Sequence, residues 1–136
     1  MNKIEEIYDA LMLGIRDYFK KNNFTKAVIG LSGGIDSSVA AYLVVKALGN
    51  KNVTALLMPD LEVTSKENIE DSKLAVRKLK IGCQIIPINE VAQSFKNINK
   101  KIKFKKNIYA IANVKARTRM ILLYCFANLN NALVIG

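Results

Sequence analysis

A glycine-bearing turn, with the sequence SGGIDSS at positions 32–38, carries the residues best suited to chemistry in this chain. It follows a short apolar run, Ala27 to Gly30, and leads into a helical pattern that ends near Leu48. A turn between a strand and a helix directs unpaired backbone N–H groups at one point, where the helix dipole adds positive charge. Because phosphate is the natural occupant of such a point, the spacing predicts a phosphate site.

Two common phosphate motifs are excluded by the residues of this turn. A Walker A loop ends in lysine followed by Ser or Thr, and Asp36-Ser37-Ser38 stands there instead. The dinucleotide fingerprint G-x-G-x-x-G also fails, since Gly30, Gly33 and Gly34 have the wrong spacing. The turn therefore predicts neither transfer of a γ-phosphoryl group nor hydride transfer.

The remaining side chains of the turn leave one question open. Gly33 and Gly34 allow the backbone to approach phosphate closely, and three serine hydroxyls, those of residues 32, 37 and 38, add donors. The carboxylate of Asp36 would repel phosphate unless a cation lies between them, and Mg²⁺ is the usual bridge. Alternatively, Asp36 is only the N-cap of the following helix. The residue types alone favour neither reading.

Composition limits the other functions that the chain can have. Its 136 residues fit a single domain, 1–136, and its net charge of +10 favours anionic partners. Only four of its 21 basic residues are arginines, and the one dense basic cluster, at 96–106, is rich in lysine. This composition argues against nucleic-acid binding. The absence of histidine excludes His-based catalysis, and Cys83 and Cys125 lie in apolar contexts that predict reduced, buried thiols.

The ends and the hydropathy of the chain predict a cytoplasmic protein with no membrane partner. No apolar run approaches the roughly 20 residues that cross a bilayer. The N-terminal stretch carries acidic residues where a signal peptide would carry a basic patch and then an apolar run.

The hydrophobic pattern predicts an α/β fold with a doubly wound, mainly parallel sheet flanked by helices, of the Rossmann-like kind. Strands are expected at 26–31, 52–58, 83–88 and 132–136, and helices at 2–21, 36–48, 64–80 and 107–129. Either Thr64 or Ser65 can cap the third helix, and Glu67 follows Thr64 as in a capping box. A helical turn is expected at 91–95, and 96–106 is expected to be a solvated loop or, alternatively, a lid that attracts an anionic substrate.

The last predicted helix has an unusual distribution of charge. No charged residue follows Arg119, and a helix that is apolar on all sides is buried on all sides. In a domain of this size, a second body must then cover it. We expect either further chain or a partner subunit, with a homodimer formed through the helix 107–129.

The turn resembles the pyrophosphate loop of the N-type ATP pyrophosphatases, which cleave ATP between its α- and β-phosphates and place AMP on a substrate oxygen. A second stretch, NVKARTRM at 113–120, resembles a helix of the ammonia-dependent NAD synthetases within that superfamily. The similarity extends to further pairs and to the last predicted strand: Leu123-Tyr124, Ala127-Asn128, Met58-Pro59, Glu70-Asp71 and Leu133 to Gly136.

The resemblance implies an NAD synthetase that joins ammonia to deamido-NAD through an adenylate. It implies that ATP binds the loop, with Mg²⁺ on Asp36, and the loop consists of Gly30, Leu31, Ser32, Gly33, Gly34, Ile35, Asp36, Ser37 and Ser38. It implies deamido-NAD binding by Arg117 first and then by Arg119, which lies about 200° away on the helix and is better placed to support the helix or an interface. Both arginines could instead make structural ion pairs.

The resemblance also sets a limit on the expected activity. The family continues well beyond the strand at 132–136, so this chain is similar to roughly its N-terminal half, and it departs from the family at Ser72 and Ala112. Two alternatives to the synthetase reading are therefore a non-catalytic module that binds nucleotide or dimerises, and another amidating or thiolating ATP pyrophosphatase.

Overall fold

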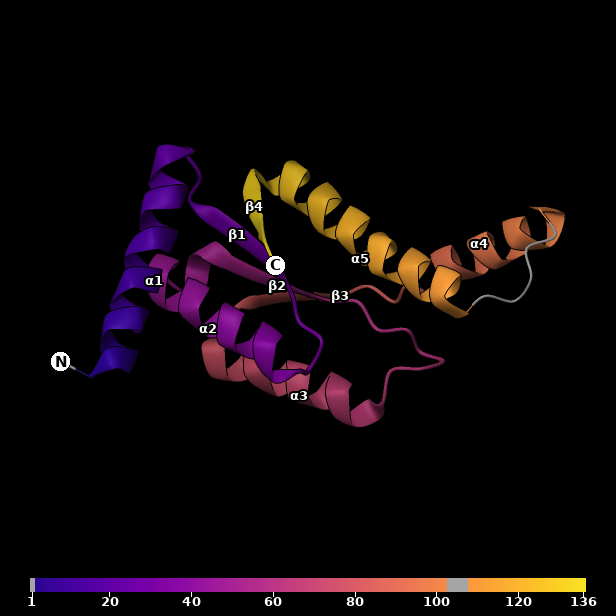
Figure 1. Cartoon of the computed structure of the whole chain (residues 1–136), viewed down its shortest axis with the longest axis horizontal. Helices are drawn as coiled ribbons and strands as arrows, with labels where there is room; N and C mark the ends of the chain where they lie inside the picture. The colour runs from indigo at the N-terminus through magenta and orange to yellow at the C-terminus, as the bar shows by residue number, and fades with distance from the viewer. Residues whose placement is uncertain (1, 103–107) are drawn as a thin grey trace.

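Four parallel strands form the centre of the computed structural model, which describes residues 2–102 and 108–136 (Figure 1). The strands are β1 (Lys26–Gly30), β2 (Val53–Leu57), β3 (Gly82–Ile85) and β4 (Ala132–Ile135), in the order β3-β2-β1-β4. Every pairing is parallel, and the register aligns Ala27 with Val53 on one side and with Leu133 on the other. The predicted doubly wound sheet is confirmed.

Helices cover both faces of this sheet. The helices α1 (Lys3–Lys21), α2 (Ile35–Leu48) and α3 (Lys66–Leu79) lie on one side, and a short 3₁₀ turn at Asn50–Asn52 links α2 to β2. The helices α4 (Asn89–Ile102) and α5 (Ile108–Asn130) connect β3 to β4, and α5 lies on the other face. Because β1 is central, alternate residues point into different cores: Ile29 meets the α1–α3 side, and Val28 meets the α5 side.

Local signals explain where the first and third helices begin. Asn2 caps α1 in a capping box with Glu5, so the predicted N-terminal helix starts at Lys3. The cap of α3 is Ser65, whose Oγ accepts from the N–H of Asn68 at 3.1 Å. The hydroxyl of Thr64 instead accepts from the backbone N–H of Asp60 at 3.0 Å, so a cap by Thr64 is the wrong alternative.

The structure differs from the sequence prediction between β3 and α5. The third strand is shorter than predicted and ends at Ile85. The helical turn expected at 91–95 is part of the 14-residue helix α4, which contains the first part of the lysine cluster as well. Residues 96–102 are helical rather than a loop, because the pattern of Val91, Phe95 and Ile98 continues at helical spacing. The attraction of an anionic substrate by this cluster stays a prediction. The remainder of the cluster, 103–107, lies outside the described residues.

The two cysteines also differ from their predicted burial. Cys83 and Cys125 are free thiols, as expected, but both residues are exposed. Cys83 lies on β3, an edge strand whose residues are all exposed, and Cys125 lies on a face of α5 that no described element covers. An apolar neighbourhood in the sequence did not mean burial here, because burial depends on what packs over the element.

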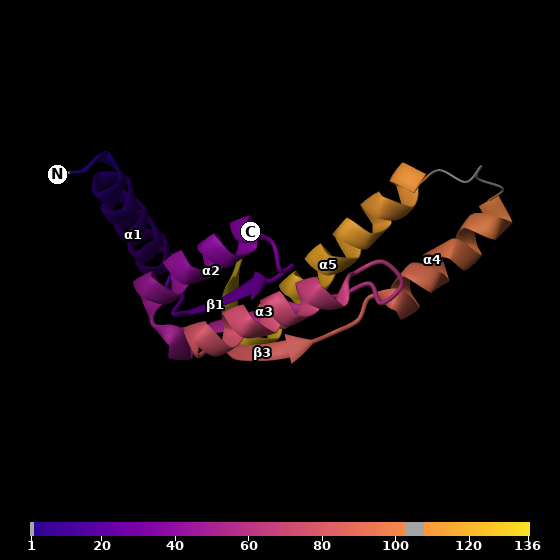
Figure 2. The ribbon, with the colours of Figure 1, turned by 90° about the horizontal axis from the view of Figure 1, so that it is seen from below.

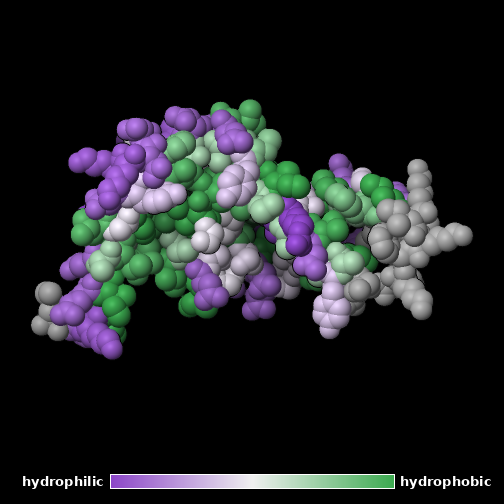
Figure 3. Space-filling view, turned by 45° about the horizontal axis from the view of Figure 1, so that its top comes forward, coloured by the Kyte–Doolittle hydropathy of each residue, from purple (hydrophilic) through white to green (hydrophobic). Residues whose placement is uncertain are grey.

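The end of α5 that leads into β4 packs on the sheet, whereas its beginning extends beyond the sheet together with α4 (Figure 2). Several large apolar side chains of α5 remain exposed in this chain: Met120, Ile121, Tyr124 and Leu129. Figure 3 shows a broad area of hydrophobic side chains on the face that it displays. Within the described residues, none of the helices combines the length and hydrophobicity that a membrane span requires.

Candidate functional site

The turn between β1 and α2 is held in shape by its own hydroxyl groups. The Oγ of Ser32 lies 3.1 Å from the Oγ of Ser37 and accepts from the N–H of Gly34 at 3.3 Å. The hydroxyls of Ser37 and Ser38 both donate to the carbonyl oxygen of Gly34, at 3.1 and 2.9 Å. These bonds fix the backbone of the turn, and they occupy the hydroxyls that the sequence suggested as phosphate donors. Their contact with phosphate stays a prediction.

Gly33 is required by its conformation and by its neighbour. Its φ of +83° lies in the left-handed region, which favours glycine. A Cβ added to Gly33 would lie 2.4 Å from the carbonyl oxygen of Asn68, in the first turn of α3. The glycine therefore lets the turn pack directly against the beginning of α3, and this contact places α3 beside the phosphate loop.

Four backbone N–H groups at this turn have no hydrogen-bond partner among the residues that the structure describes. They belong to the positions at the start of α2: Gly33, Ile35, Asp36 and Ser37. The N-cap of α2 is Gly34, which has no side chain to satisfy them. Unsatisfied donors at the positive end of a helix dipole form a cradle that suits an anion, and the binding of phosphate there stays a prediction.

The structure rules out one of the two readings of Asp36. Asp36 stands inside the first turn of α2, two positions after the N-cap, and it is exposed. Its carboxylate makes no hydrogen bond or ion pair with any described residue. Asp36 is therefore not the N-cap, and its carboxylate is available to a ligand beside the cradle.

A pocket of about 390 Å³ adjoins the first residues of the turn. The carboxyl ends of β1 and β2, the first half of α3 and one face of α5 form its wall. Its lining includes four predicted site residues, Gly30, Leu31, Ser32 and Arg119. It also includes residues that were not predicted to bind a ligand: Leu57, Met58, Pro59, Thr64, Asn68, Ile69, Ser72 and Leu123. The pocket is mainly apolar, with a small number of polar groups in its lining, as is common for small-molecule sites.

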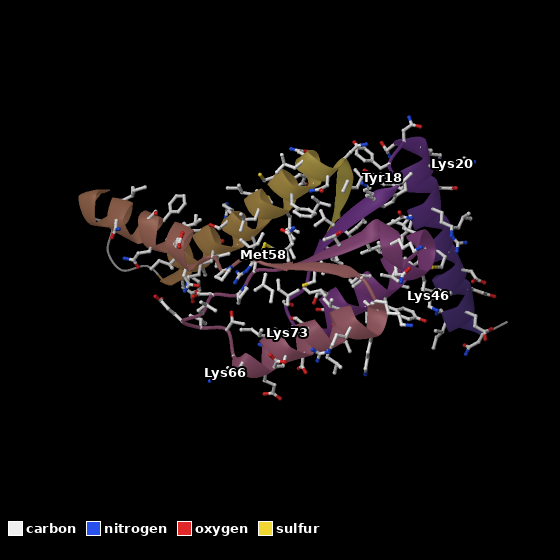
Figure 4. All side chains as sticks on the ribbon, turned by 180° about the vertical axis from the view of Figure 1, so that it is seen from behind. Tyr18, Lys20, Lys46, Met58, Lys66 and Lys73 are labelled. Carbon is white, nitrogen blue, oxygen red and sulfur yellow. The ribbon has the colours of Figure 1, made fainter. Side chains whose placement is uncertain are left out.

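The two predicted arginines of α5 have different surroundings. Arg119 lines the pocket, and its Nε donates to the carbonyl oxygen of Met58 at 3.0 Å. Figure 4 shows Met58 where the sheet meets α5. The terminal nitrogens of Arg119 make no hydrogen bond to a described residue, so they are free for a ligand. Arg117 is exposed, does not line the pocket and donates to the carbonyl oxygen of Asn113 at 3.3 Å.

The pocket includes one of the two predicted arginines and not the other. Arg119, expected mainly to support the helix, shares a pocket with the turn after β1, whereas Arg117 does not line that pocket. Neither arginine makes an ion pair with a described residue, so the structural reading of the two is not supported. Their contact with deamido-NAD stays a prediction.

A buried carboxylate lies behind the pocket wall, at Asp60. Its Oδ2 forms an ion pair with the Nζ of Lys115 on α5, and its Oδ1 accepts from the N–H of Glu62 and from the side chain of Asn89, both at 3.1 Å. Burial raises the pKa of Asp60, but these hydrogen bonds and the Lys115 charge outweigh burial and hold that pKa below its usual value. Asp60 is therefore a paired carboxylate in the folded chain.

Sequence reasoning missed most of the pocket for an identifiable reason. Ligands bind beyond the carboxyl ends of parallel strands, and this rule could have marked Met58 and Pro59 as well as the turn after β1. The contributions of Asn68, Ser72 and Leu123 depend on how α3 and α5 pack, which the sequence does not specify. Asp60 had a weaker signal, a carboxylate directly after an apolar strand.

Metal binding by the protein alone is not supported by the described residues. Nowhere in 2–102 and 108–136 do three His, Cys, Asp or Glu residues gather as a metal-binding group. Asp36 therefore stands as a single carboxylate near the cradle.

Comparison with curated proteins gives consistent relatives. The chain is 42% identical to the NH(3)-dependent NAD(+) synthetase of Staphylothermus marinus over 127 residues. This alignment covers 90% of the chain and 44% of that protein. The chain is 44% identical to the Glutamine-dependent NAD(+) synthetase of Aquifex aeolicus over 138 residues. This alignment covers 97% of the chain and 23% of that protein. The chain thus spans less than half of each of these two proteins.

Solved structures share the fold closely. The glutamine-dependent NAD+ synthetase of Acinetobacter baumannii, in complex with ADP, has a TM-score of 0.94 at 30% identity, over 98% of this chain and 25% of that one. The NH3-dependent NAD synthetase of Campylobacter jejuni, in complex with nitrate, has a TM-score of 0.88 at 34% sequence identity. The NMN synthetase of Francisella tularensis has a TM-score of 0.88 at 32% sequence identity. Each of the latter two covers the whole of this chain and 57% or 55% of its own.

The NAD synthase family model matches residues 7–136, which include the turn, every strand and the arginine-bearing helix. With that match and the relatives above, this chain belongs to the NAD synthase family.

Proposed function

We propose that this chain binds ATP and serves in the synthesis of NAD⁺ from deamido-NAD and ammonia. In that reaction, the nicotinate carboxylate attacks the α-phosphorus of ATP, and pyrophosphate leaves. Ammonia then attacks the acyl carbon of the adenylate, loses a proton and displaces AMP. The proposal concerns the whole synthetase, of which this chain supplies the described site.

The observation that carries the proposal is the position of the cradle next to the pocket. Four N–H groups at the start of α2 have no partner among the described residues and are open to an anion, and the pocket that begins at Gly30 to Ser32 has room for a nucleoside. A nucleotide could therefore place its base against the apolar wall and its phosphates on the turn. Electrostatic stabilisation of the leaving pyrophosphate follows from this arrangement, without an acid or a base.

Arg119 is the best-placed cation of the described site. Its Nε is held by Met58, and its free terminal nitrogens present a planar fork that suits phosphate or carboxylate oxygens. We assign Arg119 to the phosphate region of the nucleotide, next to the turn. Arg117, exposed on another side of α5, is the candidate for contact with the remainder of deamido-NAD.

The residues present fit a magnesium ion that arrives with the nucleotide. Mg²⁺ is commonly held by one or two carboxylates together with substrate phosphates and water, and Asp36 offers one free carboxylate beside the cradle. When bound, Mg²⁺ would neutralise charge on the leaving pyrophosphate. The role of Asp36 is then to bind that ion next to the N–H groups.

The relatives differ in their nitrogen donor and in their product, so a test must vary both the nitrogen donor and the acceptor. Both ammonia- and glutamine-dependent synthetases align with this chain, so the nitrogen donor has to be varied. A neighbour called an NMN synthetase suggests nicotinate mononucleotide as a second possible acceptor. We propose deamido-NAD and ammonia as the pair, with a homodimer through α5 in the cytoplasm as the setting.

The test uses the chain itself. Calorimetry with a non-hydrolysable ATP analogue and MgCl₂ measures binding, and incubation with ATP, MgCl₂, deamido-NAD and ammonium measures NAD⁺ and pyrophosphate. Parallel reactions replace ammonium by glutamine, or deamido-NAD by nicotinate mononucleotide. Binding with NAD⁺ formation from ammonium supports the proposal. Binding without any product supports a nucleotide-binding module, and no binding overturns the proposal.

A further inference from the structure

Two polar contacts join α5 to the segment that follows β2. The two contacts lie one helical turn apart along α5. Arg119 and Lys115 are separated by four residues on α5, so their side chains lie on one face of the helix. Met58 and Asp60 are separated by two residues in the segment after β2. Arg119 bonds to the Met58 carbonyl oxygen, and Lys115 pairs with Asp60.

Of these four residues, only Met58 and Arg119 line the pocket. The other contact lies behind the wall, where the side chain of Asp60 is 4% exposed and that of Lys115 is 16% exposed. An ion pair with so little solvent is difficult to break by removing one partner, because the other charge would remain buried. It therefore holds α5 against the segment after β2 more firmly than an exposed pair would.

Asp60 also ties this segment to α4. The side chain of Asn89, the first residue of α4, donates to Asp60 Oδ1 at 3.1 Å and accepts from the N–H of Leu61 at 2.9 Å. The backbone carbonyl oxygen of Asp60 accepts from the N–H groups of Val63 and Thr64. The carboxylate is thus the point where three segments meet.

From this geometry we infer that Lys115 and Asp60 are a positioning pair for Arg119: by clamping α5 to the segment after β2, they hold the Arg119 fork at the phosphate end of the pocket. The consequence for nucleotide binding rests on the function proposed above. Neither Lys115 nor Asp60 lines the pocket. Their effect reaches the ligand only through Arg119 and the Met58 carbonyl oxygen.

The first measurement follows Arg119 directly, in the full chain without ligand. Nuclear magnetic resonance of arginine Nε–H groups reports how fast the Arg119 Nε proton exchanges with water. In Lys115→Met, we expect this exchange to accelerate about tenfold or more, as loss of ~1.4 kcal/mol of ordering would give. Lys115→Arg, which keeps the charge, should restore most of the protection.

The matched control breaks an exposed ion pair. Lys73 lies 2.8 Å from Glu70 on the outer side of α3, and both side chains are solvated. Lys73→Met should leave the exchange of the Arg119 proton unchanged. If Lys115→Met does not fold, Asp60→Asn breaks the same pair from the other side. It leaves Lys115, the less buried partner with a side chain 16% exposed, opposite a neutral amide, and it should accelerate the same exchange.

The second measurement is a double-mutant cycle on affinity for the ATP analogue with MgCl₂. Lys115→Met should weaken binding by about tenfold in the native background, and by less than about twofold when Arg119→Met is already present. Binding of adenosine, which has no phosphate, should be nearly unchanged by Lys115→Met. A purely structural role would weaken both ligands and would add to Arg119→Met.

The outcomes separate the two proposals. Unchanged Arg119 exchange in folded Lys115→Met and Asp60→Asn would overturn the positioning role, whatever the affinity data show. Equal weakening with and without Arg119 would overturn it as well. Failure of the unmodified chain to bind the ATP analogue would overturn the proposed function, and the exchange measurement would still decide the positioning role.

Discussion

Single residues of the turn carry distinct physical tasks, and Gly33 shows this most clearly. Its positive φ and its contact with Asn68 are separate requirements, and a glycine elsewhere meets only the first of them. Gly49 has a φ of +85°, and a Cβ there would meet nothing within 4 Å. Comparing substitutions at Gly33 and Gly49 therefore separates the cost of backbone strain from the cost of a steric clash.

We expect Gly33→Ala to be considerably more destabilising than Gly49→Ala. The Gly49 variant should lose about 1–3 kcal/mol of stability from backbone strain alone. The Gly33 variant should lose a further ~1–3 kcal/mol, because its methyl group would displace the start of α3. Urea unfolding followed by circular dichroism measures both. Equal losses would show that the approach of α3 to the turn does not depend on Gly33.

Asp36 is expected to act on the ligand and hardly at all on the fold. Asp36→Asn removes a charge that no described residue contacts, so the free energy of unfolding should change little. Affinity for the ATP analogue should fall on the order of tenfold with MgCl₂, as the loss of one charge contact to a metal gives. Without metal ions, the variant should bind the analogue as well as the native chain or better, since a repulsion is removed. The same loss with and without MgCl₂ would contradict a metal-binding role.

At the scale of elements, α5 has a buried end, a pocket-lining face and an exposed apolar face. The last of these contains Ile121, which is 60% exposed, and Leu129, which is 80% exposed. The sequence predicted that this uncharged half would be covered by a second body, and in the isolated chain it is not. A partner subunit on this face would reconcile the two.

Ile121→Asp tests that partner. The native chain should sediment as a dimer at micromolar concentration, and the variant as a monomer, because a charge in an apolar interface is strongly unfavourable. Leu13→Asp is the matched control, since Leu13 is 61% exposed and lies on α1, on the opposite side of the sheet. It should leave the dimer intact. A native chain that is monomeric across the concentration range would refute the α5 interface.

How much of the fold could be predicted varies between elements. The strands β1, β2 and β4 and the helices α1, α2, α3 and α5 have clear periodicity and end signals, and they fall close to their predicted bounds. The helix α4 was missed because its lysines suggested a solvated loop, although lysine is a good helix former. The turn after β1 and its unpaired N–H groups follow from local sequence, whereas the rest of the pocket depends on how α3 and α5 pack against the sheet.

For the whole molecule, acid is expected to act through Asp60 in particular. The chain has 21 Lys and Arg residues and 11 Asp and Glu residues, so protonating its carboxylates increases an already large positive charge and favours unfolding in general. The specific contribution of Asp60 is isolated by comparison with Asp60→Asn. In that variant the group cannot ionise, and the charged partner Lys115 lies opposite an amide.

The sign of the Asp60 effect follows from its pKa, which is held below the usual 3.8 in the folded chain. Above about pH 5 both states are ionised, and the native chain has the full benefit of the ion pair. As pH falls through 3.8, the unfolded state takes up the proton first, so stability is lost until the pH passes the lowered pKa of the folded state. Asp60→Asn should therefore be less stable than the native chain near neutral pH, and the difference should shrink as the pH falls from about 5.

Urea unfolding at stepped pH, from about 6 to about 2.5, measures this convergence. Glu70→Gln serves as the control, because Glu70 is 61% exposed in its pair with Lys73 and solvent screens that pair. Its stability should follow the native curve closely at every pH. A constant difference between Asp60→Asn and the native chain would mean that Asp60 contributes packing and hydrogen bonds but no charge. The clamp on α5 would then depend on shape, and acid would not release Arg119 from the pocket.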